Sequence, residues 1–315
     1  QMAYSFDKKV ARRARAEVNT EKYDKPDLAM LLEVENRSEI GEPYSYEGSY
    51  RFRALREAKS SANNQMRELL PWVERGPANV AGRTRSILVH PDSNSVWLAG
   101  AVGGGIWKSE NAGLNWRPVA DDLPILSITT MARCDSLPHI VYAGTGEGFY
   151  NFDAVIGDGL VKSINGGESW EQILSTVDQT SFKYVNRIIV SPNDPDLIVV
   201  ATNTGIQRSD DGGDSWILVY NSGSRVQHVI ANPQNFQTQY AGVNGTGIIK
   251  STDGGLTWNS SSNFQSGFNR IELAAAHTDS SVIYAALTNS SSGLFGLFRT
   301  NDAGVSWTDL GNSPN

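Results

Sequence analysis

One glycine-rich stretch of this sequence holds the residues best placed to do chemistry. "GTGEGFYNFDAVIGDG" (144–159) carries Glu147, Asp153 and Asp158, with Tyr150 and two phenylalanines between the carboxyl groups. Two carboxyl groups beside aromatic platforms are what cleavage of a glycoside needs, one protonated to act as the general acid and its partner ionised. Glu147 and Asp158 are therefore the candidate catalytic pair.

The same stretch allows two further interpretations. A binding loop would use Glu147, Tyr150, Asp153 and Asp158 to hold a ligand, and carboxylates with backbone carbonyls would also suit calcium. The simplest interpretation is an ordered loop whose glycines make turns. Apart from calcium, no cofactor is expected.

Other enzyme motifs are absent from the sequence. The four histidines are widely separated and form no cluster with metal-ligand spacing, and no G-x-S-x-G elbow is present. "GRTR" (82–85) places two arginines near the start of the first repeat, but a three-arginine carboxylate clamp cannot be assigned. The sequence therefore predicts no metal centre and favours a binding role over catalysis.

A repeated sequence of eight residues, the octet, indicates which elements position this loop. It reads "SENAGLNW" at 109–116, "SINGGESW" at 163–170, "SDDGGDSW" at 209–216, "STDGGLTW" at 251–258 and "TNDAGVSW" at 300–307. Successive octets start 54, 46, 42 and 49 residues apart. Self-similarity at such a period is typical of repeat architectures.

Each octet closes a unit of four short strands. In the third repeat we expect strands at about 187–191, 197–202, 205–209 and 216–220, with the octet as the turn between the last two. Four-stranded antiparallel units of this length, repeated radially, form a β-propeller. The fold class is therefore all-β: a β-propeller with five visible blades, part of a larger propeller, and a helical N-terminal segment.

The octet residues are interpreted as structural. The Ser or Thr and the third-position Asp or Asn should bond backbone groups within the turn, the fifth-position Gly should adopt positive φ, and the Trp should pack between blades. Asn and Asp exchange freely at the third position, which a catalytic carboxylate would not tolerate. The structural octet residues are Ser109, Asn111, Gly113, Trp116, Ser163, Asn165, Gly167, Trp170, Ser209, Asp211, Gly213, Trp216, Ser251, Asp253, Gly255, Trp258, Thr300, Asp302, Gly304 and Trp307.

A basic residue precedes every octet. One Lys or Arg per repeat could form a ring for an anion, but its place at the blade periphery favours a solvated or snorkelling side chain. These residues are Lys108, Lys162, Arg208, Lys250 and Arg299.

The octets resemble the Asp-box, S/T-x-D-x-G-x-T/S-W, of sialidases, of xyloglucan-degrading hydrolases of glycoside hydrolase family seventy-four and of sortilin-type propellers. Together with "WVERGPANVAGRTRSILVHP" (72–91) and the 142–170 stretch, they look like secreted Asp-box (BNR-type) propeller proteins of Bacteroidota, sortilin-like or glycosyl-hydrolase-like. The resemblance covers 72–315 and implies export by type IX secretion, with the secretion machinery as a partner. It indicates fold strongly and function weakly.

Composition sets the remaining bounds. Residues 1–70 are rich in helix formers and carry a net charge of +1, which leaves the acidic balance of the −7 chain to residues 71–315. We expect 1–70 to be a helical arm or pro-region and 71–315 the propeller, either a ring of five blades or, as we favour, part of a larger propeller truncated after five repeats. The acidic balance argues against nucleic acid as a partner. No apolar run is long enough to cross a membrane, and Gln1 would suit the first residue after a removed signal peptide.

Three functions follow as hypotheses. The first is a secreted or cell-surface propeller that binds or scaffolds a protein or glycan without catalysis. The second is a polysaccharide hydrolase of the xyloglucanase kind, with two carboxylates on the face opposite the octets. The third is an assembly factor of a membrane complex.

Overall fold

The computed structural model describes residues 82–123, 125–149, 154–221, 223–262, 264, 266–291 and 293–311, together with two earlier positions, Ala54 and Glu57. Both earlier positions are helical. The rest of the predicted helical arm lies outside the described residues, and so does its predicted boundary at residue 70. By compactness the chain divides into Gln1–Tyr50 and Arg51–Asn315. All that follows concerns the second unit.

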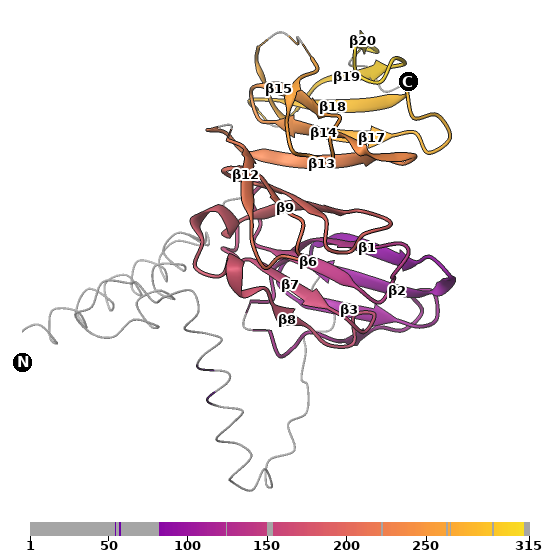
Figure 1. Cartoon of the computed structure of the whole chain (residues 1–315), viewed down its shortest axis with the longest axis vertical. Coiled ribbons are helices and arrows are strands. Elements are labelled where there is room, and N and C mark those ends of the chain that lie inside the picture. The colour runs from indigo at the N-terminus through magenta and orange to yellow at the C-terminus, as the bar shows by residue number, and fades with distance from the viewer. Residues whose placement is uncertain are drawn as a thin grey trace, which may run out of the picture. The chain divides into compact units, whose positions relative to one another are not determined.

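The described strands form five sheets, each of four antiparallel strands in chain order (Figure 1). The first two sheets consist of β1 (Thr84–His90), β2 (Ser93–Ala101), β3 (Gly105–Ser109) and β4 (Arg117–Pro118), then β5 (Ile128–Arg133), β6 (Val141–Thr145), β7 (Leu160–Ser163) and β8 (Glu171–Gln172). Two 3₁₀ turns, η1 (Leu174–Thr176) and η2 (Thr180–Phe182), lead to the third sheet. The other three sheets consist of β9 (Val185–Val190), β10 (Ile198–Thr202), β11 (Gly205–Ser209), β12 (Ile217–Tyr220), β13 (Val226–Asn232), β14 (Asn235–Val243), β15 (Gly247–Ser251), β16 (Asn259–Ser260), β17 (Phe268–Ala275), β18 (Ile283–Asn289), β19 (Leu294–Thr300) and β20 (Thr308–Asp309).

This architecture confirms the predicted fold class. The chain is an all-β protein built of propeller blades, and the four strands of the third sheet lie within two residues of the predicted bounds. Its second strand, β10, is buried along its whole length because neighbouring sheets cover both of its faces. A strand buried on both sides reads as a continuous apolar run, here "IVVAT".

Four apolar clusters hold the five sheets together. Each cluster draws its side chains from two consecutive sheets, so every interface between neighbours has its own core. The first strands of neighbouring sheets are also in contact, β1 with β5, β5 with β9, β9 with β13 and β13 with β17. The first strands therefore run side by side at the inner edge of the blades.

The octets form the predicted turns between third and fourth strands. In all five, the N–H of the fifth residue donates to the hydroxyl of the first residue at 2.9 Å, and the third-position side chain accepts the N–H of the seventh residue. The fifth-position glycines all have positive φ, between 83° and 98°. Hydrogen bonds from the Ser215 hydroxyl and N–H lower the pKa of Asp211 to about 2. The octet side chains thus supply the hydrogen bonds of their own turns.

The tryptophans that end the octets differ in their surroundings. Trp170, Trp216, Trp258 and Trp307 pack into the four cores, each with the preceding sheet, as predicted. Trp116 is 37% exposed, since its octet belongs to the first of the described sheets.

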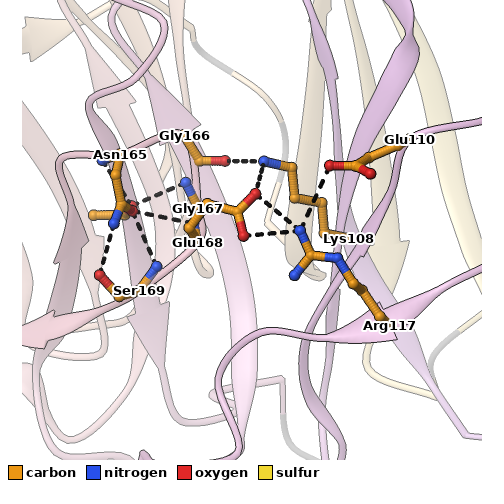
Figure 2. A network of polar contacts seen from close by, with 9 residues as sticks. Lys108, Glu110, Arg117, Asn165, Gly166, Gly167, Glu168 and Ser169 are labelled. Atoms are coloured by element: carbon orange, nitrogen blue, oxygen red, sulfur yellow. Dashed lines mark hydrogen bonds and ion pairs between the residues drawn. The ribbon is translucent and has the colours of Figure 1, made fainter.

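Some of the basic residues before the octets do not behave as predicted. Lys108 is buried and donates to the carbonyl of Gly166 at 3.0 Å and to Glu168 at 2.6 Å (Figure 2). In the same way Arg208 donates to the carbonyl of Gly254 at 3.1 Å. The prediction of a solvated or snorkelling side chain is wrong for these residues, because the cation satisfies a backbone carbonyl of the next sheet.

Figure 2 also shows how the first such contact extends to the surface. Arg117 donates to both oxygens of Glu168, at 2.9 and 2.8 Å, and lies 3.6 Å from Glu110. Hydrogen bonds from Lys108 and then Arg117 hold the pKa of Glu168 below its ordinary value. This network joins the octets of the first and second sheets.

The close approach of the sheets makes Gly242 a sensitive position. A Cβ there would lie 2.7 Å from the Cβ of Ile271 and 2.9 Å from its carbonyl oxygen, in the first strand of the next sheet. Gly242→Ala should therefore lower the free energy of unfolding by about 3 kcal/mol, the upper range for overpacking. The measurement is urea denaturation followed by tryptophan fluorescence.

Ala286 supplies the control for this substitution. It stands at the same place in the second strand of the fifth sheet. In a polypeptide that ends at Asn315, where no described sheet follows the fifth, Ala286→Val should change the free energy of unfolding by less than about 1 kcal/mol. Equal losses in the two variants would contradict the sheet contact at Gly242.

Candidate functional site

The candidate loop lies on the face opposite the octets. It joins β6 to β7, the second and third strands of the second sheet. In each antiparallel sheet the second strand ends, and the first strand begins, on this same face. Of its predicted site residues, Tyr150 and Asp153 lie outside the described residues. Glu147 and Asp158 are described, and both are buried.

Glu147 forms an ion pair with two arginines from the first sheet. Its Oε2 accepts from Nη2 of Arg83 at 2.9 Å, and its Oε1 accepts from Nη2 and Nε of Arg85 at 2.7 and 3.2 Å. The Glu147 side chain is fully buried, whereas Arg83 and Arg85 are 44% and 25% exposed. Both carboxylate oxygens of Glu147 are therefore occupied by guanidinium groups of the protein itself.

Asp158 has separate partners within its own sheet. Its Oδ1 accepts the N–H of Asp178 at 3.0 Å, and its Oδ2 accepts from Nε2 of Gln172 at 3.3 Å. Its backbone N–H donates to the Thr145 hydroxyl at 2.8 Å. Asp158 thus fastens the return of the loop to the blade, and no hydrogen bond joins it to Glu147 among the described residues.

The loop also places an aromatic ring between two cations. The Phe149 ring lies 4.5 Å from the guanidinium carbon of Arg85 in the first sheet and 4.3 Å from that of Arg270 in the fifth. The next backbone carbonyl towards the N-terminus, that of Gly148, accepts from Nη1 of Arg225 at 3.3 Å. The loop therefore carries aromatic and carbonyl groups to which three different sheets present arginine.

The first strands carry a polar side chain at one matching position. In each sheet this residue is paired with a glycine or alanine near the end of the second strand. The partners are Gly100, Gly144, Ala201, Gly242 and Ala286. We call the first-strand residues the polar layer; they are Ser86, Thr130, Arg187, His228 and Glu272.

Side chains of the polar layer join one first strand to the next. The Thr130 hydroxyl accepts the N–H of Ile188 at 3.2 Å, and Nδ1 of His228 accepts the N–H of Leu273 at 2.9 Å. Nε2 of His228 lies 3.5 Å from a Glu272 oxygen. The imidazole therefore bonds as the neutral tautomer with its proton on Nε2.

Arg187 is the positively charged residue of the polar layer that comes from the third sheet. It is partly buried, and no hydrogen bond or ion pair joins it to another of the described residues. Burial lowers the pKa of its guanidinium, while the nearby Glu272 carboxylate opposes that shift. Since a guanidinium remains charged in proteins, Arg187 is a cation beside the first strands without a bonded anion.

The loop and the first strands together define an arginine-rich site. Arg270 donates to Glu272 through Nε at 2.7 Å and also through Nη2, and Glu147 neutralises part of the remaining charge. Five arginines and two glutamates therefore gather at the loop and the first strands. We call this group the arginine cluster: Arg83, Arg85, Arg187, Arg225 and Arg270, with Glu147 and Glu272.

Sequence reasoning found only part of this site. It singled out Glu147 and noted Arg83 and Arg85, but it missed Arg187, Arg225 and Arg270. No motif in the sequence marks these three arginines. Aligning the first strands of the repeats by their Gly or Ala partners would have brought Arg187, His228 and Glu272 to one level.

Two hollows in the described surface lie at the octets. One of about 480 Å³ lies between the fourth and fifth sheets, lined by Lys250, residues 259–262 and Val305, among others. One of about 170 Å³ lies beside the exposed Trp116. Lys250 already donates to the carbonyl of Ala303 at 2.8 Å, so its charge serves the sheet interface and the arginine cluster is the stronger candidate site.

Metal and membrane features are limited to what the described residues can show. In that part of the chain, no three His, Cys, Asp or Glu side chains gather as metal ligands would. Asp153, one of the residues predicted for a calcium site, lies outside it. None of the helices in the described part has the length and hydropathy of a membrane span.

Comparison with known proteins gives the fold class. No family model matches the chain, and no curated protein does. Among solved structures, an ancestral GH74 enzyme is similar over 73% of this chain, with a TM-score of 0.58 and 20% identity. The GH74 xyloglucanase from Xanthomonas campestris is similar over 73%, with a TM-score of 0.50 and 17% identity.

A third similar structure is the extracellular domain of a hybrid two-component system from B. thetaiotaomicron, over 76% of this chain, with a TM-score of 0.52 and 14% identity. This chain spans 31%, 45% and 28% of the three matched chains in the order given. Likeness at such low identity establishes the β-propeller fold, and function has to be argued from the site.

Proposed function

We propose that this protein is a non-catalytic binding or scaffold propeller, secreted or held at the outer cell surface, which binds a carboxylate-bearing ligand at the arginine cluster. The observation that carries the proposal is the gathering of guanidinium groups beside the loop, among them Arg187, which has no hydrogen bond or ion pair to another of the described residues. Guanidinium is the side-chain group best matched to carboxylates, through paired charge-assisted hydrogen bonds. The source of the carboxylate is a uronic acid in a glycan or an acidic protein segment.

The extracellular location rests on two supports. One is the resemblance of the octets and of residues 72–91 to secreted propeller proteins, and it also motivates the proposal that the protein is type IX secretion cargo. The other is the fold likeness to an extracellular sensor domain. Immunodetection of the protein in cells with and without the type IX translocon would test the route, and equal surface amounts in both would exclude it.

A polysaccharide hydrolase is the second candidate function. The fold likeness to GH74 enzymes favours it. Against it, Glu147 is bonded to two arginines through both oxygens, and Asp158 accepts hydrogen bonds at both of its oxygens. A general acid has to reach the scissile oxygen and give it a proton, whereas the oxygens of both carboxyl groups are already held by donors of the protein.

Titration calorimetry with three polymers tests the proposed ligand chemistry. Polygalacturonate and polyglutamate carry carboxylates on a glycan and on a peptide, and xyloglucan carries none. We expect binding to one of the acidic polymers, loss of about tenfold in affinity in Arg187→Gln, and weakening at high salt. Arg117→Gln, on the octet side, is the matched control and should bind as the unmodified protein does.

Two results would overturn the proposal. One is the same affinity in Arg187→Gln and Arg117→Gln for every acidic polymer bound. The other is release of reducing sugar from xyloglucan by the purified protein, which would establish the hydrolase.

A further inference from the structure

Neighbouring sheets are joined by a recurring pair of side chains. A tyrosine on the second strand and a lysine on the third face each other across the sheet, as Tyr142 does Lys162 and Tyr240 does Lys250. In both pairs the ammonium lies over the tyrosine ring, at 5.1 and 5.5 Å from its centre. Both tyrosines are fully buried.

In both pairs the tyrosine hydroxyl lies within 3.5 Å of the carbonyl of the fourth residue of the next octet. The Tyr240 hydroxyl and the Lys250 ammonium donate to the same carbonyl, that of Ala303, at 2.9 and 2.8 Å. Tyr142 donates to the carbonyl of Pro195 at 3.1 Å, and the carbonyl of Gly212 lies 3.5 Å from its hydroxyl. The fourth octet residue has a positive φ in all five octets, which gives this carbonyl the same backbone setting in each.

The fifth sheet carries the same pair without a target. Tyr284 on β18 faces Arg299 on β19, and the guanidinium carbon lies 5.5 Å from the ring centre. Tyr284 is 37% exposed, unlike its two buried counterparts. The Nε of Arg299 is buried and has no hydrogen-bond partner among the described residues. Such a buried unpaired donor costs free energy unless a partner is supplied.

We propose that the Tyr284–Arg299 face of the fifth sheet receives a further octet turn, carried by a sixth four-stranded sheet of the same polypeptide. The carbonyl of its fourth residue accepts from the Tyr284 hydroxyl and the Arg299 guanidinium. The inference is independent of the proposed ligand, since it concerns the opposite end of the blade.

Continuity with the established interfaces identifies the occupant. At each of the four filled interfaces, the octet comes from the sheet that follows next in the chain. A sheet of the same polypeptide docks without the loss of translational freedom that a separate molecule pays. The competing occupant is a second copy, which would offer its first octet, where Ala112 is exposed.

The test compares two polypeptides, one ending at Asn315 and the complete product of the gene. Lys250→Met, which keeps the stem but removes the donor, should lower Tm by about 4 °C in both. Arg299→Met should lower Tm by a similar amount in the complete product, and by less than about 1 °C in the polypeptide that ends at Asn315.

Three outcomes would overturn the inference. The gene could encode no further octet after Trp307. Arg299→Met could leave Tm unchanged in the complete product. Sedimentation could show that the polypeptide ending at Asn315 self-associates and that Arg299→Met abolishes the association, in which case a second copy is the occupant.

Discussion

Glu147→Gln is expected to lower the free energy of unfolding by about 2 kcal/mol. Breaking a buried ion pair by removing one partner costs about 3–5 kcal/mol when the remaining charge stays buried. Here Arg83 and Arg85 are partly exposed, so water recovers some of that loss. The amide nitrogen of the new glutamine is moreover a hydrogen-bond donor and would face the N–H donors of Arg83 and Arg85. Denaturant unfolding measures the change.

Glu168→Gln is the matched control. Glu168 also bonds two cations, Lys108 and Arg117, but it is 41% exposed, so its loss should cost below about 1 kcal/mol. Equal costs for the two glutamines would show that the Glu147 pair is solvated and would remove the structural argument against catalysis.

The same substitution separates the two candidate functions. In a hydrolase, Glu147→Gln would abolish turnover and leave stability nearly unchanged, since a catalytic acid is held for reactivity. In the binding propeller, Glu147→Gln destabilises the loop and leaves the arginines in place. Binding of an acidic polymer would then persist below the melting transition of the variant.

The blade architecture could be predicted from the sequence because its signals are local. Each octet contains the residues of its own turn: Ser209 and Asp211 bond backbone groups two to four residues away, and Gly213 supplies a positive φ within the same turn. Five copies of one local pattern then fix the period of the sheets.

The basic residues before the octets were misjudged for the opposite reason. Lys108 reaches Gly166, 58 positions further along the chain, and Arg208 reaches Gly254, 46 further. The sequence near Lys108 does not indicate that its ammonium group meets a backbone carbonyl of the next repeat. A basic residue kept at one repeat position was the available signal, and solvation was the wrong interpretation of it.

The candidate site combines a local signal, which the sequence shows, with long-range contacts, which it does not show. Glu147 and Asp158 were found because they stand in one unusual loop, yet the structure gives them separate partners. Arg187 and Arg270 come from the third and fifth sheets, and only the packing of the first strands brings them towards that loop. The catalytic and ligand roles predicted for the loop residues stay predictions, and those of Tyr150 and Asp153 lie outside the described residues.

His228 should make the protein lose stability between about pH 6.5 and 4. Burial is the main cause that lowers the pKa of this imidazole from 6.5 to about 4; Glu272 opposes the shift, and Arg187 and Arg270 add to it. In that window the unfolded chain binds a proton that the folded chain does not, so the free energy of unfolding falls as pH falls. The full loss is about 3 kcal/mol, is complete near pH 4, and is absent above pH 7.

His228→Asn tests this dependence, because the asparagine Oδ1 can accept the Leu273 N–H in place of Nδ1 and does not titrate. We expect a lower stability at pH 7 but a flatter slope from pH 6.5 to 4. His139→Asn, at an exposed histidine, should keep the slope of the unmodified protein.

The third-position aspartates of the octets do not obscure the comparison. Hydrogen bonds from Ser215 and Ser306 hold the pKa of Asp211 and of Asp302 at about 2, so their contribution to stability is lost only below about pH 4. Parallel slopes in the unmodified protein and His228→Asn would mean that this imidazole binds a proton equally well in the folded and the unfolded chain. That result would contradict the hydrogen bond in which the unprotonated Nδ1 accepts the Leu273 N–H.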